Sequence, residues 1–124
     1  MKKIILLLFL VTITTSYSQD KKCTTFINGK FKYENPEYAN FIVTRNDTIQ
    51  TEVDDVKNIS VEGSVKWLSD CNYVLTYTKV NLPSLQNLIG RKVKVEIKEI
   101  DGKKITCLSK MDDIVLELQM IKIE

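Results

Sequence analysis

The chain has 124 residues, which is enough for one hydrophobic core and too few for two. It contains no histidine, so Ser-His and Cys-His nucleophile pairs and histidine-ligated zinc or haem are excluded. The formal net charge is only +2, and Lys2 and Lys3 belong to a predicted export signal, so the mature chain is neutral. Nucleic acid is therefore not expected as a partner, because phosphate binding usually shows as a strongly basic domain.

The amino terminus has the three-part layout of a secretory signal peptide: two lysines, an apolar run over residues 4–11, and a small polar stretch over residues 16–18. We expect cleavage after Ser18 and a periplasmic or secreted mature protein, residues 19–124. The apolar run is shorter than the roughly 20 residues that span a membrane, so the chain is not expected to be membrane-spanning. Charged residues precede Cys23, which is why we do not expect a lipoprotein.

The mature chain alternates apolar and polar residues with a period of two, and turn residues interrupt it about every ten positions. This pattern predicts about eight strands, with Gly63 as a bulge or bend in the fourth. A longer connection from Leu82 to Gly90 is expected to hold one helical turn. The predicted strands cover residues 29–33, 40–45, 48–53, 59–67, 73–77, 92–98, 104–109 and 114–120.

Short connections between successive strands favour an up-and-down arrangement over a Greek-key sandwich. We therefore predict an all-β fold, an antiparallel meander that forms a small lipocalin-like barrel or a strongly curled sheet. Closure would remove the exposed edges that such a chain otherwise presents.

Three cysteines, Cys23, Cys71 and Cys107, allow three pairings in an oxidising compartment. We favour a disulfide between Cys23 and Cys71, because Cys23 lies in the segment most in need of anchoring and Cys71 lies at a strand junction. Cys107 would then be a buried, inert thiol.

Several stretches of the first half of the mature chain are distinctive: Cys23, Gly29-Lys30-Phe31-Lys32-Tyr33, Thr44-Arg45-Asn46-Asp47-Thr48 with Gln50 and Glu52, and Val65-Lys66-Trp67-Leu68-Ser69-Asp70-Cys71-Asn72-Tyr73 through Tyr77. In these residues the chain resembles a family of short secreted bacterial proteins of unknown function, some of which carry a topoisomerase IV name. The resemblance implies no established activity. A topoisomerase is a large DNA-breaking enzyme with nucleotide and metal sites, which do not fit in an exported domain of this size, so we treat the name as misplaced.

Aromatic residues at inward positions are the candidate ligand-binding residues, because a barrel of about eight strands can hold one small molecule. The alternative is a filled core, in which the same side chains pack only against one another. Trp67 is expected to be buried on the same strand face as Val65. The candidates are Tyr33, Phe41, Trp67, Tyr73 and Tyr77.

Charged residues offer weaker candidates. Arg45 and Glu52 lie on neighbouring predicted strands and are expected to form a surface ion pair of little energetic value. The row Lys92, Lys94 and Lys98 is expected to be a solvated sheet face, because acidic residues interrupt it. The pairs Asp54-Asp55 and Asp112-Asp113 are interpreted as turn residues, since no calcium-binding loop pattern surrounds them.

The sequence shows no catalytic, metal-binding or phosphate-binding constellation, so we expect no enzyme, no cofactor and no metal. The favoured hypothesis is an exported small barrel that binds a small apolar or amphipathic ligand. The alternative is an envelope-associated or extracellular interaction protein with a filled core and no small-molecule ligand. Cavity volume separates the two hypotheses.

Overall fold

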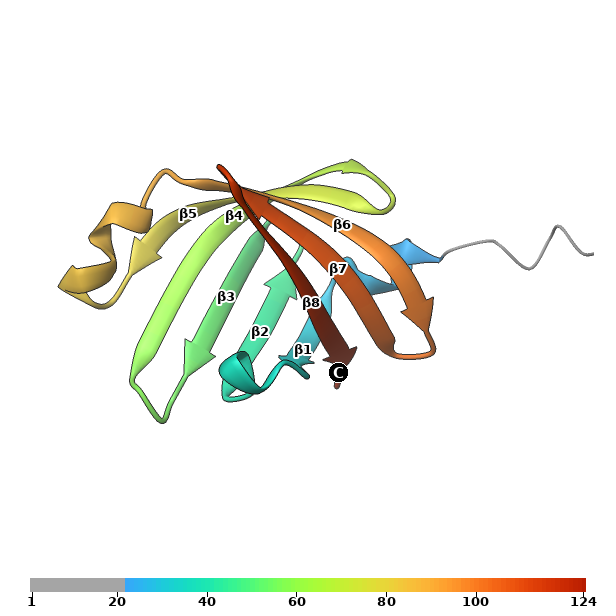
Figure 1. Cartoon of the computed structure of the whole chain (residues 1–124), viewed down its shortest axis with the longest axis horizontal. Helices are drawn as coiled ribbons and strands as arrows, with labels where there is room; N and C mark the ends of the chain where they lie inside the picture. Colours follow the sequence, from blue (N-terminus) through green and yellow to red (C-terminus); the bar gives the residue numbers. More distant parts are fainter. Residues whose placement is uncertain (1–21) are drawn as a thin grey trace, which may run out of the picture.

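A computed structural model describes residues 22–124 of the chain (Figure 1). The predicted signal peptide and its cleavage after Ser18 lie outside the described residues. Most of the described chain is strand. It also contains three short 3₁₀ helices, of which the first precedes β1 and the other two lie between strands. In chain order the elements are η2 (Cys23–Phe26), β1 (Gly29–Tyr33), η3 (Pro36–Tyr38), β2 (Phe41–Asn46), β3 (Ile49–Asp54), β4 (Ile59–Ser69), β5 (Asn72–Val80), η4 (Pro83–Leu88), β6 (Lys92–Asp101), β7 (Lys104–Met111) and β8 (Ile114–Lys122).

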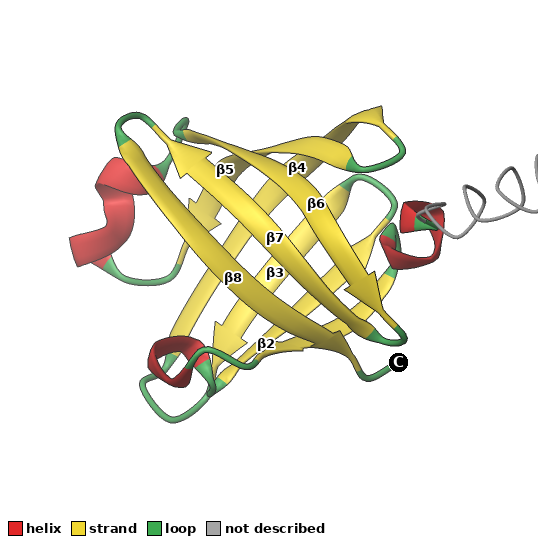
Figure 2. Ribbon diagram, turned by 45° about the vertical axis from the view of Figure 1, so that its right-hand side comes forward, coloured by secondary structure: helices red, strands yellow, loops and turns green. Residues whose placement is uncertain are grey.

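The eight strands form one closed barrel in sequence order, and every neighbouring pair is antiparallel (Figure 2). Closure comes from β8 pairing with β1, where Phe31 lies opposite Lys122 and Tyr33 lies opposite Met120. The predicted meander is thus confirmed, and the barrel is the form it takes. This closing ladder is short, because β1 ends at Tyr33 while β8 begins several residues before Met120.

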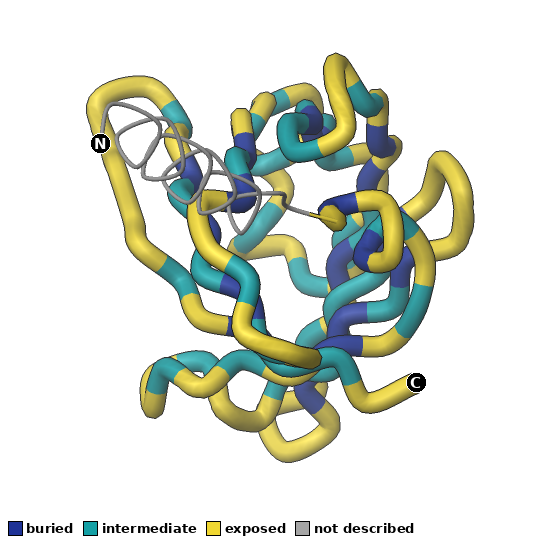
Figure 3. Tube along the Cα trace, turned by 90° about the vertical axis from the view of Figure 1, so that its right-hand side faces the viewer, coloured by how far each residue is buried: buried dark blue, intermediate teal, exposed yellow. Residues whose placement is uncertain are grey.

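Alternation along the strands separates an interior from a solvated surface, as Figure 3 shows by burial. In β1, for example, Phe31 is fully buried while Lys30 and Lys32 are exposed. Because successive side chains of a strand point to opposite faces of the sheet, every second side chain points into the barrel. The buried apolar core consists of Cys23, Phe26, Phe31, Val43, Val65, Tyr73, Leu75, Val95, Ile97, Ile105, Cys107 and Met120.

Gly63 marks an irregularity in β4, as predicted, because the register between β4 and β5 shifts at Glu62 and Gly63. A side chain would not fit here: a Cβ on Gly63 would lie 2.7 Å from Leu75 Cδ1 and 2.8 Å from the carbonyl oxygen of Thr76. The backbones of β4 and β5 therefore lie too close together at this point for a residue with a side chain.

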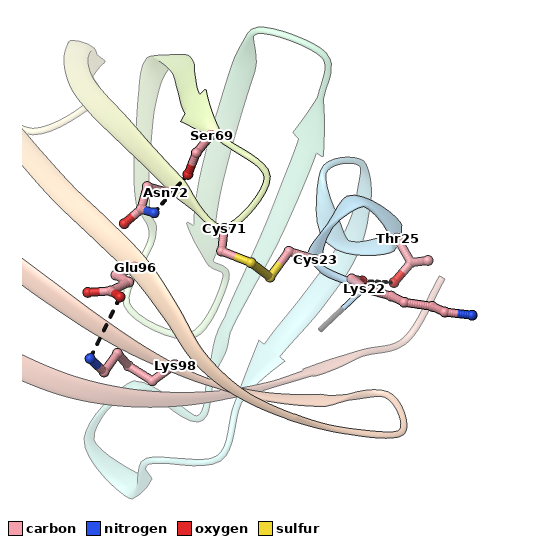
Figure 4. Close-up of a disulfide and its surroundings, with 8 residues drawn as sticks. All are labelled: Lys22, Cys23, Thr25, Ser69, Cys71, Asn72, Glu96 and Lys98. Atoms are coloured by element: carbon pink, nitrogen blue, oxygen red, sulfur yellow. Dashed lines mark hydrogen bonds and ion pairs between the residues drawn. A yellow bond between two sulfur atoms is a disulfide. The ribbon is translucent and has the colours of Figure 1, made fainter. Parts of the chain in front are cut away.

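One end of the barrel is closed by η2, which a disulfide joins to the turn between β4 and β5 (Figure 4). The bond links Cys23 to Cys71 with a Cα–Cα distance of 5.2 Å, and Cys107 is a buried free thiol. Both predictions about the cysteines are confirmed. Phe26 of η2 is buried and belongs to the apolar core, so η2 covers the interior at that end.

The helical turn predicted between Leu82 and Gly90 is η4, and it lies at the opposite end of the barrel from η2 (Figures 1 and 2). Several strands extend further than the sequence pattern indicates. β5 continues to Val80, β6 to Asp101 and β7 to Met111, because pairing with the neighbouring strand continues to these residues. None of the helices in residues 22–124 combines the length and apolar character needed to cross a membrane.

Candidate functional site

The interior at the end opposite η2 is not filled by side chains. It contains two adjoining lobes with volumes of about 150 Å³ and about 290 Å³. The lobes share six lining residues, so they adjoin each other, and the two together are called the cavity. The shared residues are Tyr33, Glu52, Tyr77, Leu88, Leu116 and Leu118.

Apolar and aromatic side chains make up most of the cavity wall. The smaller lobe reaches towards the packed core, where Leu75, Val95 and Met120 line it. The larger lobe extends towards the outside and is lined further by Tyr38, Phe41, Ile59, Val61 and Leu85. A volume of this order is far above the roughly 30 Å³ of one water molecule and approaches the lower end of the range for ligand pockets.

The mouth of the cavity lies among residues that solvent reaches. Leu116 of β8 is 42% exposed although it lines both lobes, and Ile114, which lines the smaller lobe, is 54% exposed. Leu88 of η4 and Tyr38 of η3 are half-buried on the same wall. The short connections η3 and η4 therefore edge an opening through which a small molecule can reach the interior.

The closed end of the interior holds a buried arginine. Arg45 is 2% exposed and donates hydrogen bonds to the carbonyl oxygens of Phe26 (2.8 Å) and Ile27 (2.9 Å). It also donates to Gln50 Oε1 at 2.6 Å and to the Tyr73 hydroxyl at 3.1 Å. Arg45 thus connects the η2 segment to strands β3 and β5.

Aromatic rings enclose the same guanidinium group. Its Cζ atom lies 4.8 Å from the ring centres of Phe31 and Tyr73 and 5.7 Å from that of Trp67. Such contacts attract a cation through the negative faces of the rings. The positive charge of Arg45 is therefore held by rings and carbonyl groups inside the closed end.

Glu52 is the polar centre of the open half. Its Oε1 accepts a hydrogen bond from the Tyr33 hydroxyl at 3.2 Å, and its Oε2 accepts one from Gln50 Nε2 at 3.2 Å. Burial raises the pKa of Glu52, and the hydrogen bonds from Gln50 and Tyr33 and the charge of Arg45 offset that increase only in part.

The expected surface ion pair of Arg45 and Glu52 is wrong. Both side chains lie inside the barrel, and the register places Arg45 opposite Gln50 and Glu52 opposite Val43. Gln50 stands between the two charges and hydrogen-bonds to both. A sequence pattern places charged residues on the surface by default, whereas here the polar side chains of β3 alternate inwards.

The tyrosine hydroxyls around Glu52 are held neutral by their surroundings. Burial raises the pKa of Tyr33 well above its ordinary value and raises the pKa of Tyr73 to about 12. Tyr77 has its pKa raised by burial too, with the charge of Glu52 adding to the effect. Burial also raises the pKa of Cys107 to about 11, so this thiol stays protonated at neutral pH.

The structure brings four of the five candidate ligand-binding residues to the cavity. Tyr33 and Tyr77 line both lobes, Phe41 lines the larger lobe and Tyr73 lines the smaller one. Trp67 does not line either lobe. It is half-buried on the inward face of β4 at the closed end, and its ring centre is 4.6 Å from that of Tyr73.

Sequence reasoning did not name the leucines of the cavity or Gln50 as candidates. Leu116 and Leu118 were visible as one face of an alternating strand, and that signal alone does not separate a wall of a cavity from a packed core. Leu88 carries no periodic signal, since it lies in the connection between β5 and β6. Gln50 shares the inward face of β3 with Glu52 and could be found only with the register known.

The other charged candidates lie on the surface or in turns. Lys92, Lys94 and Lys98 are exposed, as predicted. Asp54 accepts hydrogen bonds from the backbone N–H groups of Val56 (2.9 Å) and Lys57 (3.0 Å), so it shapes the turn after β3. Within residues 22–124, no cluster of three or more histidine, cysteine, aspartate or glutamate side chains could hold a metal ion.

In comparisons with known proteins, no family model, curated protein or solved structure matches the chain. A function is therefore inferred from the geometry of the cavity. That geometry offers an apolar wall, one carboxylate and no metal cluster among the described residues.

Proposed function

We propose that this protein is an exported β-barrel that binds one small apolar or amphipathic molecule in the open half of its interior. The larger lobe, about 290 Å³ with a mainly leucine, valine, isoleucine and aromatic wall, is the observation that carries the proposal. Transfer of apolar groups from water to such a wall provides the binding free energy, at roughly 25 cal/mol for each Å² buried.

The arrangement of the barrel supports the same function. Strand pairing holds the wall in place before a ligand arrives, so little ordering free energy is spent on binding. The disulfide and the Arg45 network close one end, and the opposite end opens among η3, η4 and the start of β8. An interaction protein with a filled core is less well supported, because the side chains of the chain leave this half of the interior empty.

An export location is part of the proposal. The disulfide between Cys23 and Cys71 forms and persists in an oxidising compartment, which agrees with the predicted signal peptide. A ligand carrier there would hold molecules of low solubility outside the cytoplasm.

The proposal is tested by titration with N-phenylnaphthylamine, a neutral apolar dye whose emission rises when water is excluded. We expect saturable binding of one dye per chain. Leu118→Trp, which enlarges a side chain lining both lobes, should weaken dye binding by about tenfold or more.

The matched control is Ile49→Trp, since Ile49 is 47% exposed on the outward face of β3 and lines neither lobe. This variant should bind the dye as the wild type does. Thermal unfolding of both variants checks that the barrel is intact. Absence of saturable binding to the wild type, or equal binding by Leu118→Trp, would show that the interior is not the site.

A further inference from the structure

The cavity wall contains one charged side chain. Among the described residues, no side chain of opposite charge forms an ion pair with it. Of all the residues that line the two lobes, only Glu52 has a charged side chain. The ion pairs within residues 22–124 do not include Glu52. Buried charges in proteins are normally paired or coordinated, so a carboxylate that faces an open cavity lacks a partner that a ligand can supply.

The nearest cation does not serve as that partner or as a site for a ligand anion. Arg45 has five N–H donors, and its four hydrogen bonds end on two backbone carbonyls, Gln50 and Tyr73. It is almost fully buried, and the Gln50 side chain separates it from Glu52. An anionic head group in the cavity would therefore meet the Glu52 carboxylate without reaching Arg45.

The Glu52 carboxylate has unused capacity to accept hydrogen bonds. Its two oxygens accept one bond each, from Tyr33 and Gln50, whereas an ionised carboxylate has about four acceptor positions. Tyr77 lines both lobes beside it, so a second hydroxyl oxygen stands on the same wall. An ammonium group, with three donors and a positive charge, matches this set of acceptors.

The orientation of β3 gives independent support. Gln50, Glu52 and Asp54 point inwards, while the apolar Ile49 and Val53 occupy the alternate positions. If β3 paired with its neighbours one residue out of the present register, Ile49 and Val53 would point inwards, as is expected in a filled core. Asp54 accepts hydrogen bonds from the turn after β3, and Gln50 accepts one from Arg45, which explains why these two side chains point inwards. Glu52 differs, because part of the hydrogen-bonding capacity of its carboxylate is not used by any of the described residues.

We infer that the ligand is an amphiphile with a protonated amine head group, which the Glu52 carboxylate binds inside the barrel while the apolar tail lies along the leucine wall. This inference rests on the proposed function, because it assigns the ligand class of the same cavity.

The test compares three ligands with the same tail, decylamine, decanol and decanoate, by displacement of N-phenylnaphthylamine from the full mature chain at neutral pH. The wild type should bind decylamine at least about tenfold more tightly than decanol, because a hydrogen bond to a charged group contributes more than a neutral one. Decanoate should bind more weakly than decanol.

The Glu52→Gln variant removes the charge and retains the shape of the side chain. It should lose the preference for decylamine and bind decanol as the wild type does, which also shows that the variant is folded. Glu62→Gln is the matched control, since Glu62 belongs to the outward face of β4, where it pairs with Lys79. This control should leave the order of the three ligands unchanged.

The outcomes separate the two proposals. If the dye binds but decanoate competes as well as or better than decylamine, or if no member of the series displaces it, the inference is overturned and the apolar cavity stands. An unchanged preference for decylamine in Glu52→Gln overturns it as well. If the wild type binds no dye at all, the proposed function fails and this inference fails with it.

Discussion

Arg45 is a charged residue that holds the closed end of the barrel together. Its side chain reaches the carbonyl oxygens of Phe26 and Ile27 from β2, so it fixes the η2 segment against the strands. The cost of burying the charge is offset by four hydrogen bonds and by the surrounding rings. Its role is therefore structural.

Replacement of Arg45 by methionine should be strongly destabilising. The change retains an apolar stem but leaves two carbonyl oxygens, Gln50 and the Tyr73 hydroxyl without their donor, for a loss of about 3–5 kcal/mol in the free energy of unfolding. Denaturant unfolding measures this loss. Arg91→Met is the control, because Arg91 pairs with Asp112 at the surface and should change stability by no more than about 1 kcal/mol. Equal effects of the two changes would contradict the assignment.

The raised pKa of Glu52 makes stability depend on pH. A raised pKa means that the Glu52 carboxyl binds its proton more tightly in the folded chain than in the unfolded chain. The contribution of Glu52 to stability should therefore fall as pH rises from the pKa of a solvated glutamate, about 4.3, through its raised value in the fold.

Glu52→Gln should remove this part of the pH dependence and make the barrel more stable than the wild type at neutral pH without ligand. Unfolding curves measured across mildly acidic to neutral pH compare the two proteins. Parallel stability profiles for the two proteins would show that Glu52 does not titrate differently on folding.

At the scale of elements, the sequence predicted the strands well where one face is apolar and poorly where it is not. β6 and β8 alternate clearly and were placed with short errors at their ends. β3 was found as a strand, but its buried face could not be recognised, because its polar residues are the ones that point inwards. The direction of Gln50 and Glu52 depends on pairing with β2 and β4, which is tertiary information.

The η2 segment depends on the disulfide for its position over the closed end. Cys23 and Cys71 enclose a loop with a sequence separation of 48, and restriction of the unfolded chain predicts about 4 kcal/mol of stabilisation. The double variant Cys23→Ser, Cys71→Ser should lose about this much stability in denaturant unfolding.

Native protein should also resist alkylation at Cys107, which is buried and has a raised pKa. Peptide mapping that finds Cys107 in the linked peptide would overturn this account.

At the scale of the whole molecule, the barrel is divided into a packed end and an open end. The sequence predicted the meander, the cysteine pairing and most of the aromatic lining. It left closure undecided, since the ladder between β1 and β8 joins residues near the two ends of the chain. It also did not distinguish a filled interior from a hollow one, because the same apolar alternation produces both.

The position of Trp67 illustrates this limit. The inward face of β4 was correctly predicted, yet Trp67 packs against the closed end with Tyr73 while Tyr33 and Tyr77 face the cavity. Depth along the barrel axis decides between the two environments. That depth follows from strand tilt and register, which period-two patterns do not encode.

The most direct test of the central claim is native mass spectrometry of the protein recovered from its own cells, with organic extraction of whatever it holds. We predict a complex of one chain with one small apolar or amphipathic molecule, which organic solvent releases. Leu118→Trp, recovered in the same way, should be free of it. A wild-type chain that carries no ligand would contradict the claim, as would a ligand that Leu118→Trp retains in full.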